Sequence, residues 1–257
     1  MSKSILVLLQ IFFLCCTSKT DHQTFSNQAS SYQQPVLFKI IKDIPLPPGY
    51  QRIKDTGNSF TEWLRSVPLK KDNRVYLYNG SLKRNQMAQF AVLNIPVGNK
   101  DLQQCADAVM RLRAEYLFAV KRFNEISFTD NTGKEYKWLG KNDRKEFESY
   151  LQNVFGWCNS ASLEKQLKSV DDFYNIQPGD VLIKGGFPGH AMLITDVAIN
   201  TEGKKILMLA QSYMPAQDIH IVKNPSDESM SPWYEINDNS EIVTPEYLFY
   251  KNQLRRW

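Results

Sequence analysis

The feature that most constrains the fold is a succession of short apolar runs in the C-terminal third of the chain. They are rich in Val, Ile and Leu and lie between turn sequences such as Pro178-Gly179-Asp180. The runs cover residues 181–183, 191–199, 206–210 and 219–222. Short runs of this kind, bounded by glycine and proline, are typical of β-strands, and strands joined by short turns pair antiparallel. We therefore expect an antiparallel sheet in this part of the chain.

A long amphipathic helix is predicted before these strands, over residues 101–123. Its apolar residues recur at steps of three and four and form one face, on which Cys105 also lies. Asp101 is expected to cap the helix. Two further helices are predicted over residues 143–155 and 162–168. Helices followed by a run of strands indicate an α+β fold.

The N-terminus has the pattern of an export signal. Lys3 precedes an apolar stretch over residues 5–14, which is too short to span a membrane as a mature helix. The stretch leads into Cys15 and Cys16, and the run Phe-Leu-Cys-Cys resembles a bacterial lipobox. Cys16 follows a small residue and is the expected site of lipidation. The alternative is an ordinary secretory signal with two incidental cysteines.

Three segments follow from this pattern: a signal peptide at residues 1–15, a lipid-anchored tether at residues 16–34, and one domain with an N-terminal elaboration at residues 35–257. The expected location is the membrane, by a lipid anchor, facing the periplasm or the cell surface. The formal net charge of +4 is small, and no Lys/Arg run carries interleaved aromatic residues. We therefore expect no nucleic-acid partner.

Two cysteines remain in the folded part, Cys105 and Cys158. In an exported protein they could form a disulfide. Cys105 lies in the first turn of the predicted helix, where free backbone N–H groups and the helix dipole stabilise a thiolate. The same N–H groups could bind an oxyanion. Cys105 is therefore a candidate nucleophile, with a disulfide or plain packing as the alternatives.

His190 is the histidine that best suits a base beside such a nucleophile. His22 lies in the tether, and His220 alternates with apolar neighbours, as on the solvent face of a sheet. His190 begins a predicted strand, where a firmly held ring with an exposed tip suits a general base. No cluster of His, Cys and Asp has ligand spacing, and no glycine-rich phosphate loop is present. We therefore expect no metal and no cofactor.

The runs IQPGDVLI (176–183) and GHAMLI (189–194) resemble the second half of papain-like amidases of the NlpC and CHAP type. In those families the catalytic His starts the strand after a Pro-Gly-Asp turn, and the nucleophilic Cys lies in the first turn of an earlier helix. The resemblance implies a papain-like α+β fold in which a nucleophile-bearing helix, starting near Cys105, packs on an antiparallel sheet. A closer likeness, over most of residues 40–256, is to a family of bacterial lipoproteins known only as a domain of unknown function.

The resemblance also implies a polar residue that orients the histidine from the next strand. Gln211, at the end of residues 206–210, is the candidate. A glutamine accepts a hydrogen bond from an imidazole N–H but carries no charge, so it would orient the base without strongly raising its pKa. Asn99, Gln103 and Gln104 are candidates for the oxyanion hole. The residues around the candidate nucleophile lack the usual Asp-Cys-Ser motif. A degenerate, non-catalytic domain therefore stays an alternative.

The combined interpretation is a cysteine peptidase or amidase of the cell envelope that cleaves an amide bond through Cys105, His190 and Gln211. By analogy with the resembled families, its substrate is a cell-wall peptide. The expected partners are that peptide or another envelope substrate, and the membrane through Cys16. Two alternatives stay open: a non-catalytic lipoprotein that binds peptide or glycan in the same groove, and an enzyme that acts on lipid acyl groups.

Overall fold

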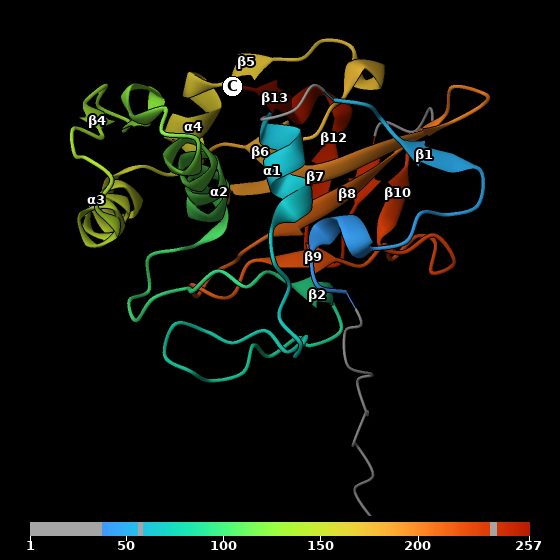
Figure 1. Cartoon of the computed structure of the whole chain (residues 1–257), viewed down its shortest axis with the longest axis horizontal. Helices are drawn as coiled ribbons and strands as arrows, with labels where there is room; N and C mark the ends of the chain where they lie inside the picture. The colour runs from blue at the N-terminus through green and yellow to red at the C-terminus, as the bar shows by residue number, and fades with distance from the viewer. Residues whose placement is uncertain (1–37, 56–58, 237–240) are drawn as a thin grey trace, which may run out of the picture. The chain divides into compact units, whose positions relative to one another are not determined.

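The computed structural model describes residues 38–55, 59–236 and 241–257 (Figure 1). These residues belong to one unit of the chain, Gln34–Trp257. The expected signal peptide at residues 1–15, the expected lipidation site Cys16 and the whole expected tether at residues 16–34 lie outside the described residues.

A nine-stranded antiparallel sheet dominates the described residues. Along the sheet the strands follow the order β2-β9-β8-β7-β6-β13-β5, while β1 pairs with β7 and β10 pairs with β8. The strands of this sheet are β1 (Tyr50–Arg52), β2 (Gln89–Val92), β5 (Lys168–Ser169), β6 (Val181–Lys184), β7 (His190–Asn200), β8 (Lys205–Gln211), β9 (His220–Val222), β10 (Trp233–Glu235) and β13 (Leu254–Arg256). Two small hairpins are formed by β3 (Ser127–Thr129) with β4 (Glu135–Lys137), and by β11 (Glu241–Val243) with β12 (Leu248–Tyr250).

Four α-helices occur in the described part of the chain: α1 (Phe60–Ser66), α2 (Cys105–Ala119), α3 (Arg144–Trp157) and α4 (Ser160–Gln166). The described residues also form four 3-10 helices: η1 (Ile41–Asp43), η2 (Phe123–Glu125), η3 (Phe173–Asn175) and η4 (Lys251–Gln253). Polar side chains at the N-caps explain where three of the α-helices begin, because they satisfy backbone N–H groups that the first turn leaves free. The capping residues of α1, α3 and α4 are Ser59, Asp143 and Asn159.

The sheet separates two clusters of buried apolar side chains. Side chains alternate between the two faces of a strand, so neighbours on β6 and β8 belong to different clusters. On β6, Val181 and Ile183 pack with the helices, whereas Leu182 packs on the other face. On β7 the register shifts between Ile194 and Asp196, and this irregularity leaves the Asp196 carboxylate buried within the fold.

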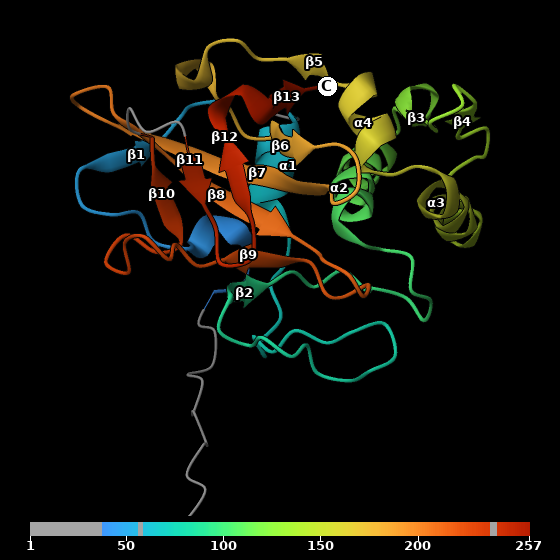
Figure 2. The ribbon, with the colours of Figure 1, turned by 180° about the vertical axis from the view of Figure 1, so that it is seen from behind.

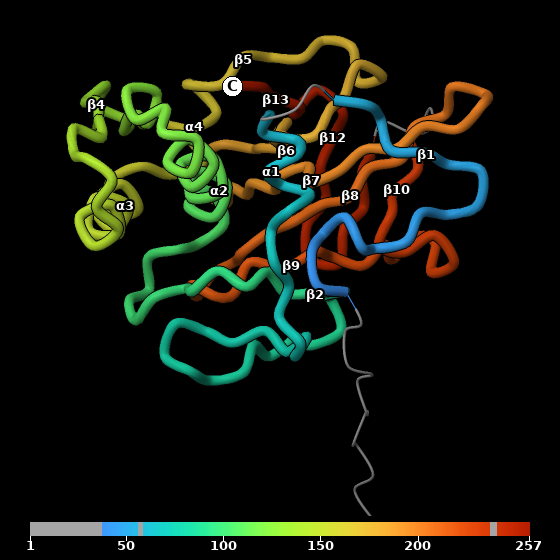
Figure 3. The backbone as a smooth tube through the Cα atoms, in the orientation of Figure 1, coloured from blue at the N-terminus to red at the C-terminus, as the bar shows by residue number. Residues whose placement is uncertain are grey.

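The figures show what covers each face of the sheet. Helix α1 crosses in front of β7 in Figure 1, and the β11–β12 hairpin lies over the opposite face, as the view from behind shows (Figure 2). The chain between α1 and β2, residues 67–88, forms a long excursion beyond β9 and β2 (Figure 3). Lys83 lies in this segment and belongs to the site that is described below.

The expected papain-like α+β fold, with a nucleophile-bearing helix packed on an antiparallel sheet, is wrong. The described residues form a sheet-rich protein: a large antiparallel sheet of nine strands with four short helices, and no nucleophile-bearing helix packed on it as in that fold. The physical reason lies in long-range pairing. The N-terminal strands β1 and β2 pair with β7 and β9, and the C-terminal β13 pairs with β6, which enlarges the sheet beyond the four predicted runs.

Candidate functional site

Cys105 is the first residue of α2, as its place in a first helical turn predicts. The cap differs from the expected one, because Gln104 precedes the helix and its N–H donates to Asp107 Oδ2 at 3.0 Å. The thiol is a free, half-buried group. The backbone N–H groups of Ala106 and Ala191 act to lower the pKa of the thiol, so the thiol lies near the start of α2 and the start of β7.

The pKa of the Cys105 thiol is raised to about 11, against the expected lowering. Burial is the main cause, and the nearby Asp107 carboxyl adds to it; the backbone N–H groups act in the opposite direction but do not outweigh these effects. Cys105 is therefore a neutral thiol at neutral pH. The expectation of a stabilised thiolate is wrong because the cost of partial burial, with the nearby Asp107 carboxyl, outweighs the effect of the helix terminus.

His190 is the first residue of β7 and is 1% exposed. Its Nε2 lies 2.8 Å from Gln211 Oε1, so the structure brings these two predicted residues together. The rings of Tyr213 and Tyr247 pack against the imidazole, with centroids 4.8 and 4.9 Å away. Burial lowers the pKa of His190 to about 4, although the Gln211 hydrogen bond raises it. The ring is therefore a neutral base at neutral pH.

Gln211 is itself oriented by a buried ion pair. Its Nε2 donates to Glu246 Oε2 at 2.8 Å, and the same carboxylate accepts from Lys83 Nζ at 2.6 Å. A carboxylate only accepts hydrogen bonds, so the amide nitrogen of Gln211 must face Glu246 and its oxygen must face His190. From this chemistry we assign the ring proton of His190 to Nε2. The Nδ1 atom is then the free acceptor.

His220 completes this network from β9. Its Nδ1 lies 2.9 Å from the Asp218 carbonyl oxygen and its Nε2 lies 3.3 Å from Gln211 Nε2. A ring protonated at Nδ1 satisfies both contacts, because Nε2 then accepts the second amide proton of Gln211. The expected place on the solvent face is wrong: His220 is fully buried, and its ring contacts Gln211 inside the fold. Burial lowers the pKa of His220 to about 3.

A cavity of about 390 Å³ lies in front of His190. Cys105 and His190 both line it, together with Tyr213, which follows β8. The cavity lies where the start of α2 meets the end of α3 and the segment between β6 and β7. Cys158 lines the same cavity as a free, buried thiol. Both cysteines are therefore unpaired, and the alternative of a disulfide between them does not hold for this structure.

Asp107 is a residue of this cavity that the sequence analysis missed. It is 6% exposed, and its Oδ1 has no hydrogen-bond partner among the described residues. Burial raises its pKa well above the usual range of a carboxyl group. A third position in a helix is an ordinary place for an acidic residue, so the sequence alone carries no signal that this carboxyl faces a cavity.

The three oxyanion candidates fall in different places. Gln104 lines the cavity. Gln103 is buried beside it, where its Oε1 accepts from Arg111 Nη1 at 3.2 Å. Asn99 is exposed and does not line the described cavity. Lys83 and Glu246 were also missed, because they lie 163 positions apart and neither belongs to a motif.

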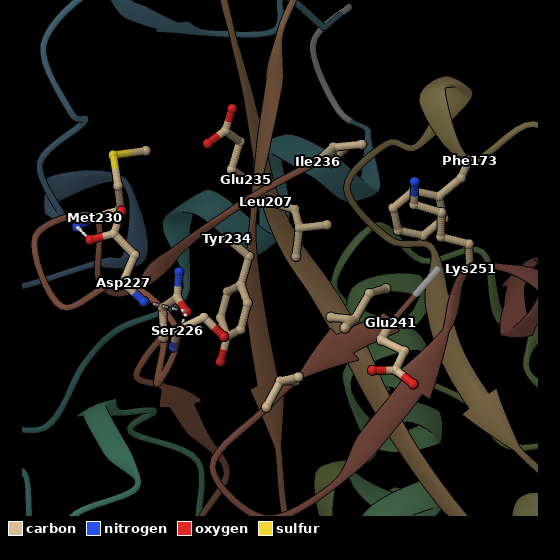
Figure 4. Close-up of a pocket in the computed structure, with 13 residues that line it drawn as sticks. Phe173, Leu207, Ser226, Asp227, Met230, Tyr234, Glu235, Ile236, Glu241 and Lys251 are labelled. Carbon is tan, nitrogen blue, oxygen red and sulfur yellow. Dashed lines mark hydrogen bonds between the residues drawn. The ribbon is translucent and has the colours of Figure 1, made fainter. Parts of the chain in front are cut away.

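A larger cavity of about 450 Å³ lies near β10 and β11 (Figure 4). Tyr234, Glu235 and Glu241 line it, and Lys251 lies at one side beside Phe173. None of the described residues that line it is a cysteine or a histidine. Cys105 and His190, the candidate nucleophile and base, line the smaller cavity instead.

The described residues contain no group of three or more His, Cys, Asp or Glu side chains arranged to hold a metal ion. Within the same ranges, no helix has the length and apolar character needed to cross a bilayer.

The described residues form an antiparallel-sheet protein with a cavity that Cys105 and His190 both line, and Gln211 and the Lys83–Glu246 ion pair lie behind the imidazole. The chain belongs to the family described as Domain of unknown function (4846), whose family model matches residues 40–140 and 137–256. This match supports the expected family of unknown function, but it shows neither a lipoprotein nor a papain-like resemblance. No curated protein and no solved structure matches the chain.

Proposed function

We propose that this protein is a cysteine hydrolase that cleaves an amide bond with Cys105 as nucleophile, His190 as base and Gln211 as the residue that orients the base. The observation that carries the proposal is the shared cavity: Cys105 and His190 line it, and Gln211 holds the imidazole from behind at 2.8 Å. A nucleophile, a base and a base-orienting group in this order are the parts of covalent acyl transfer.

The pKa values indicate how the reaction begins. A thiol with a pKa of about 11 and an imidazole with a pKa of about 4, which line the same cavity, are both neutral at rest, so the thiolate and the imidazolium are not the resting forms. His190 Nδ1 therefore takes the thiol proton while the sulfur attacks the amide carbonyl carbon. The imidazolium then gives this proton to the leaving amine as the C–N bond breaks. Water, deprotonated by His190, hydrolyses the thioester and releases the free thiol.

The cell envelope is the proposed location, with a cell-wall peptide as the substrate. This part rests on the export pattern and on lipidation at Cys16, which lies outside the described residues. If Cys16 is acylated, the full chain should enter the detergent phase of a phase-partition experiment, and Cys16→Ala should shift it to the aqueous phase. An unmodified Cys16 in the intact mass of the membrane fraction would contradict the proposal.

The enzymatic proposal is tested on the full chain in detergent, with purified peptidoglycan and soluble stem peptides as probes. New amines, detected by mass spectrometry, should appear with the wild type and disappear with Cys105→Ala. His190→Ala should slow release by about 10²–10⁴-fold, as loss of a general base does. Cys158→Ser is the comparison variant, because it removes the other free thiol of the described residues; since Cys158 lines the same cavity, its loss should at most slow release, whereas Cys105→Ala abolishes it. Equal release by wild type and Cys105→Ala would refute the hydrolase.

The raised thiol pKa also favours a second candidate, a non-catalytic protein that binds peptide or glycan in the same cavity. In that case the same probes should bind equally well to the wild type and to Cys105→Ala, measured by calorimetry, and no amine should be released.

A further inference from the structure

Three exposed apolar side chains surround the mouth of the cavity that contains Cys105. Trp157, Phe187 and Met214 are 62%, 92% and 64% exposed, and all three line this cavity. They come from separate parts of the chain: the end of α3, the segment between β6 and β7, and the segment after β8. Large apolar side chains gathered on a surface mark a binding site more often than isolated ones do.

The charge of the cavity restricts what can bind there. Among its described lining residues, none is Lys, Arg or Glu, and the only acidic residue is Asp107. Burial raises the pKa of the Asp107 carboxyl and so disfavours its charged form, and burial lowers the pKa of His190 to about 4, so its ring is neutral. An anionic group entering this cavity would lose its water without a Lys or Arg side chain among the described lining residues to pair with, which is costly. An apolar group would lose little favourable hydration free energy and would cover the exposed apolar side chains.

We propose that Trp157, Phe187 and Met214 form an apolar subsite that binds an uncharged, apolar amino-acid side chain next to the bond attacked by Cys105. The inference rests on the proposed function, because it places the occupant beside the nucleophile. A cavity of about 390 Å³ has the size of a site for a small ligand. The subsite makes the protein selective for substrates whose residue at the scissile amide is aromatic or branched aliphatic.

Alkylation of Cys105 tests this subsite without requiring turnover. The full chain is treated with iodoacetamide, N-benzyl iodoacetamide, N-carboxymethyl iodoacetamide and N-dodecyl iodoacetamide, and peptide mapping gives separate rates for Cys105 and Cys158. The benzyl reagent should label Cys105 about tenfold faster than iodoacetamide, which corresponds to the transfer of one ring from water. The carboxymethyl reagent should be slower than iodoacetamide.

Variants of the rim assign this preference to the subsite. Trp157→Ser and Phe187→Ser should each reduce the benzyl preference about threefold, and Phe187→Leu should retain most of it. Leu139→Ala is the matched control, because Leu139 is 89% exposed and does not line the cavity. The same preference in all variants, or none in the wild type, would overturn the proposal. A dodecyl rate far above the benzyl rate would also overturn it, because a lipid acyl chain would then be the occupant.

The outcomes separate this inference from the proposed function. Selective alkylation that depends on the rim, together with no amide cleavage by any variant, supports the subsite and refutes the hydrolase. Amide cleavage that depends on Cys105 but shows no apolar preference supports the hydrolase and refutes the subsite.

Discussion

Removing the Glu246 carboxylate tests the buried network behind His190 most directly. Glu246 accepts from Lys83 at 2.6 Å and from Gln211 at 2.8 Å. In Glu246→Ala the ammonium group of Lys83 loses its counter-charge, and the amide of Gln211 loses the acceptor that fixes its direction. We expect both a less stable protein and a His190 ring with mixed tautomers.

The magnitude follows from the burial of the pair. The side chains of Lys83 and Glu246 are 7% and 15% exposed. Removing one partner of a buried pair costs about 3–5 kcal/mol, because the remaining charge stays buried without compensation. We expect a loss within this range for Glu246→Ala. The double variant Lys83→Met/Glu246→Ala should recover most of the lost free energy of unfolding, because it leaves no buried charge without a partner.

The pH dependence has a defined sign. Burial lowers the pKa of Lys83 from its usual 10.5, while Glu246 raises it. Without Glu246 the pKa of Lys83 falls further. At pH values between this lowered pKa and the usual 10.5, the folded variant therefore binds fewer protons than its unfolded chain. The stability of the variant therefore rises with pH in that window. Its deficit relative to the wild type should be largest near about pH 7 and smaller near about pH 10.

Urea unfolding at both pH values gives the free energies of unfolding, and long-range ¹H–¹⁵N spectra of the His190 ring give its tautomer. The wild type should show a proton on Nε2 alone. Glu241→Ala is the matched control, since Glu241 is an exposed residue of the neighbouring strand β11. A loss below about 1 kcal/mol together with an unchanged His190 tautomer would refute the role assigned to the ion pair.

Three further predictions concern the same fold. The pKa of His190 is lowered from 6.5 to about 4, so between these pH values the unfolded chain binds a proton that the folded protein does not. This difference should lower the free energy of unfolding by about 3 kcal/mol as the pH drops from 6.5 to about 4. Urea unfolding of His190→Gln should show a smaller fall. Asp196 is fully buried and accepts from Arg52 at 2.5 Å and from Arg65 at 2.9 Å, so Asp196→Ala should lose about 3–5 kcal/mol in thermal or urea unfolding; a loss near zero would contradict this assignment. The rate of Cys105 alkylation by iodoacetamide should keep rising about tenfold per pH unit up to about pH 11, and a plateau below about pH 8 would show a thiolate that the structure does not support.

The sequence by itself determined the local positions of the proposed catalytic residues. The three- and four-residue apolar period predicted a helix with Cys105 in its first turn, and the apolar run after Gly189 predicted a strand that begins at His190. The same pattern placed Gln211 at the end of the next strand. These predictions succeed because helix and strand periods depend on residues a few positions apart.

Only the tertiary structure decided the extent of the sheet and the electrostatic character of the site. Strand β1 joins β7, and β13 joins β6, through pairings across more than 70 positions that no local period records. The same long-range packing buries Cys105 and His190, which raises the pKa of the thiol and lowers that of the imidazole. A helix terminus favours a thiolate only where water or an opposite charge can support it, and burial depends on residues that the local sequence does not contain.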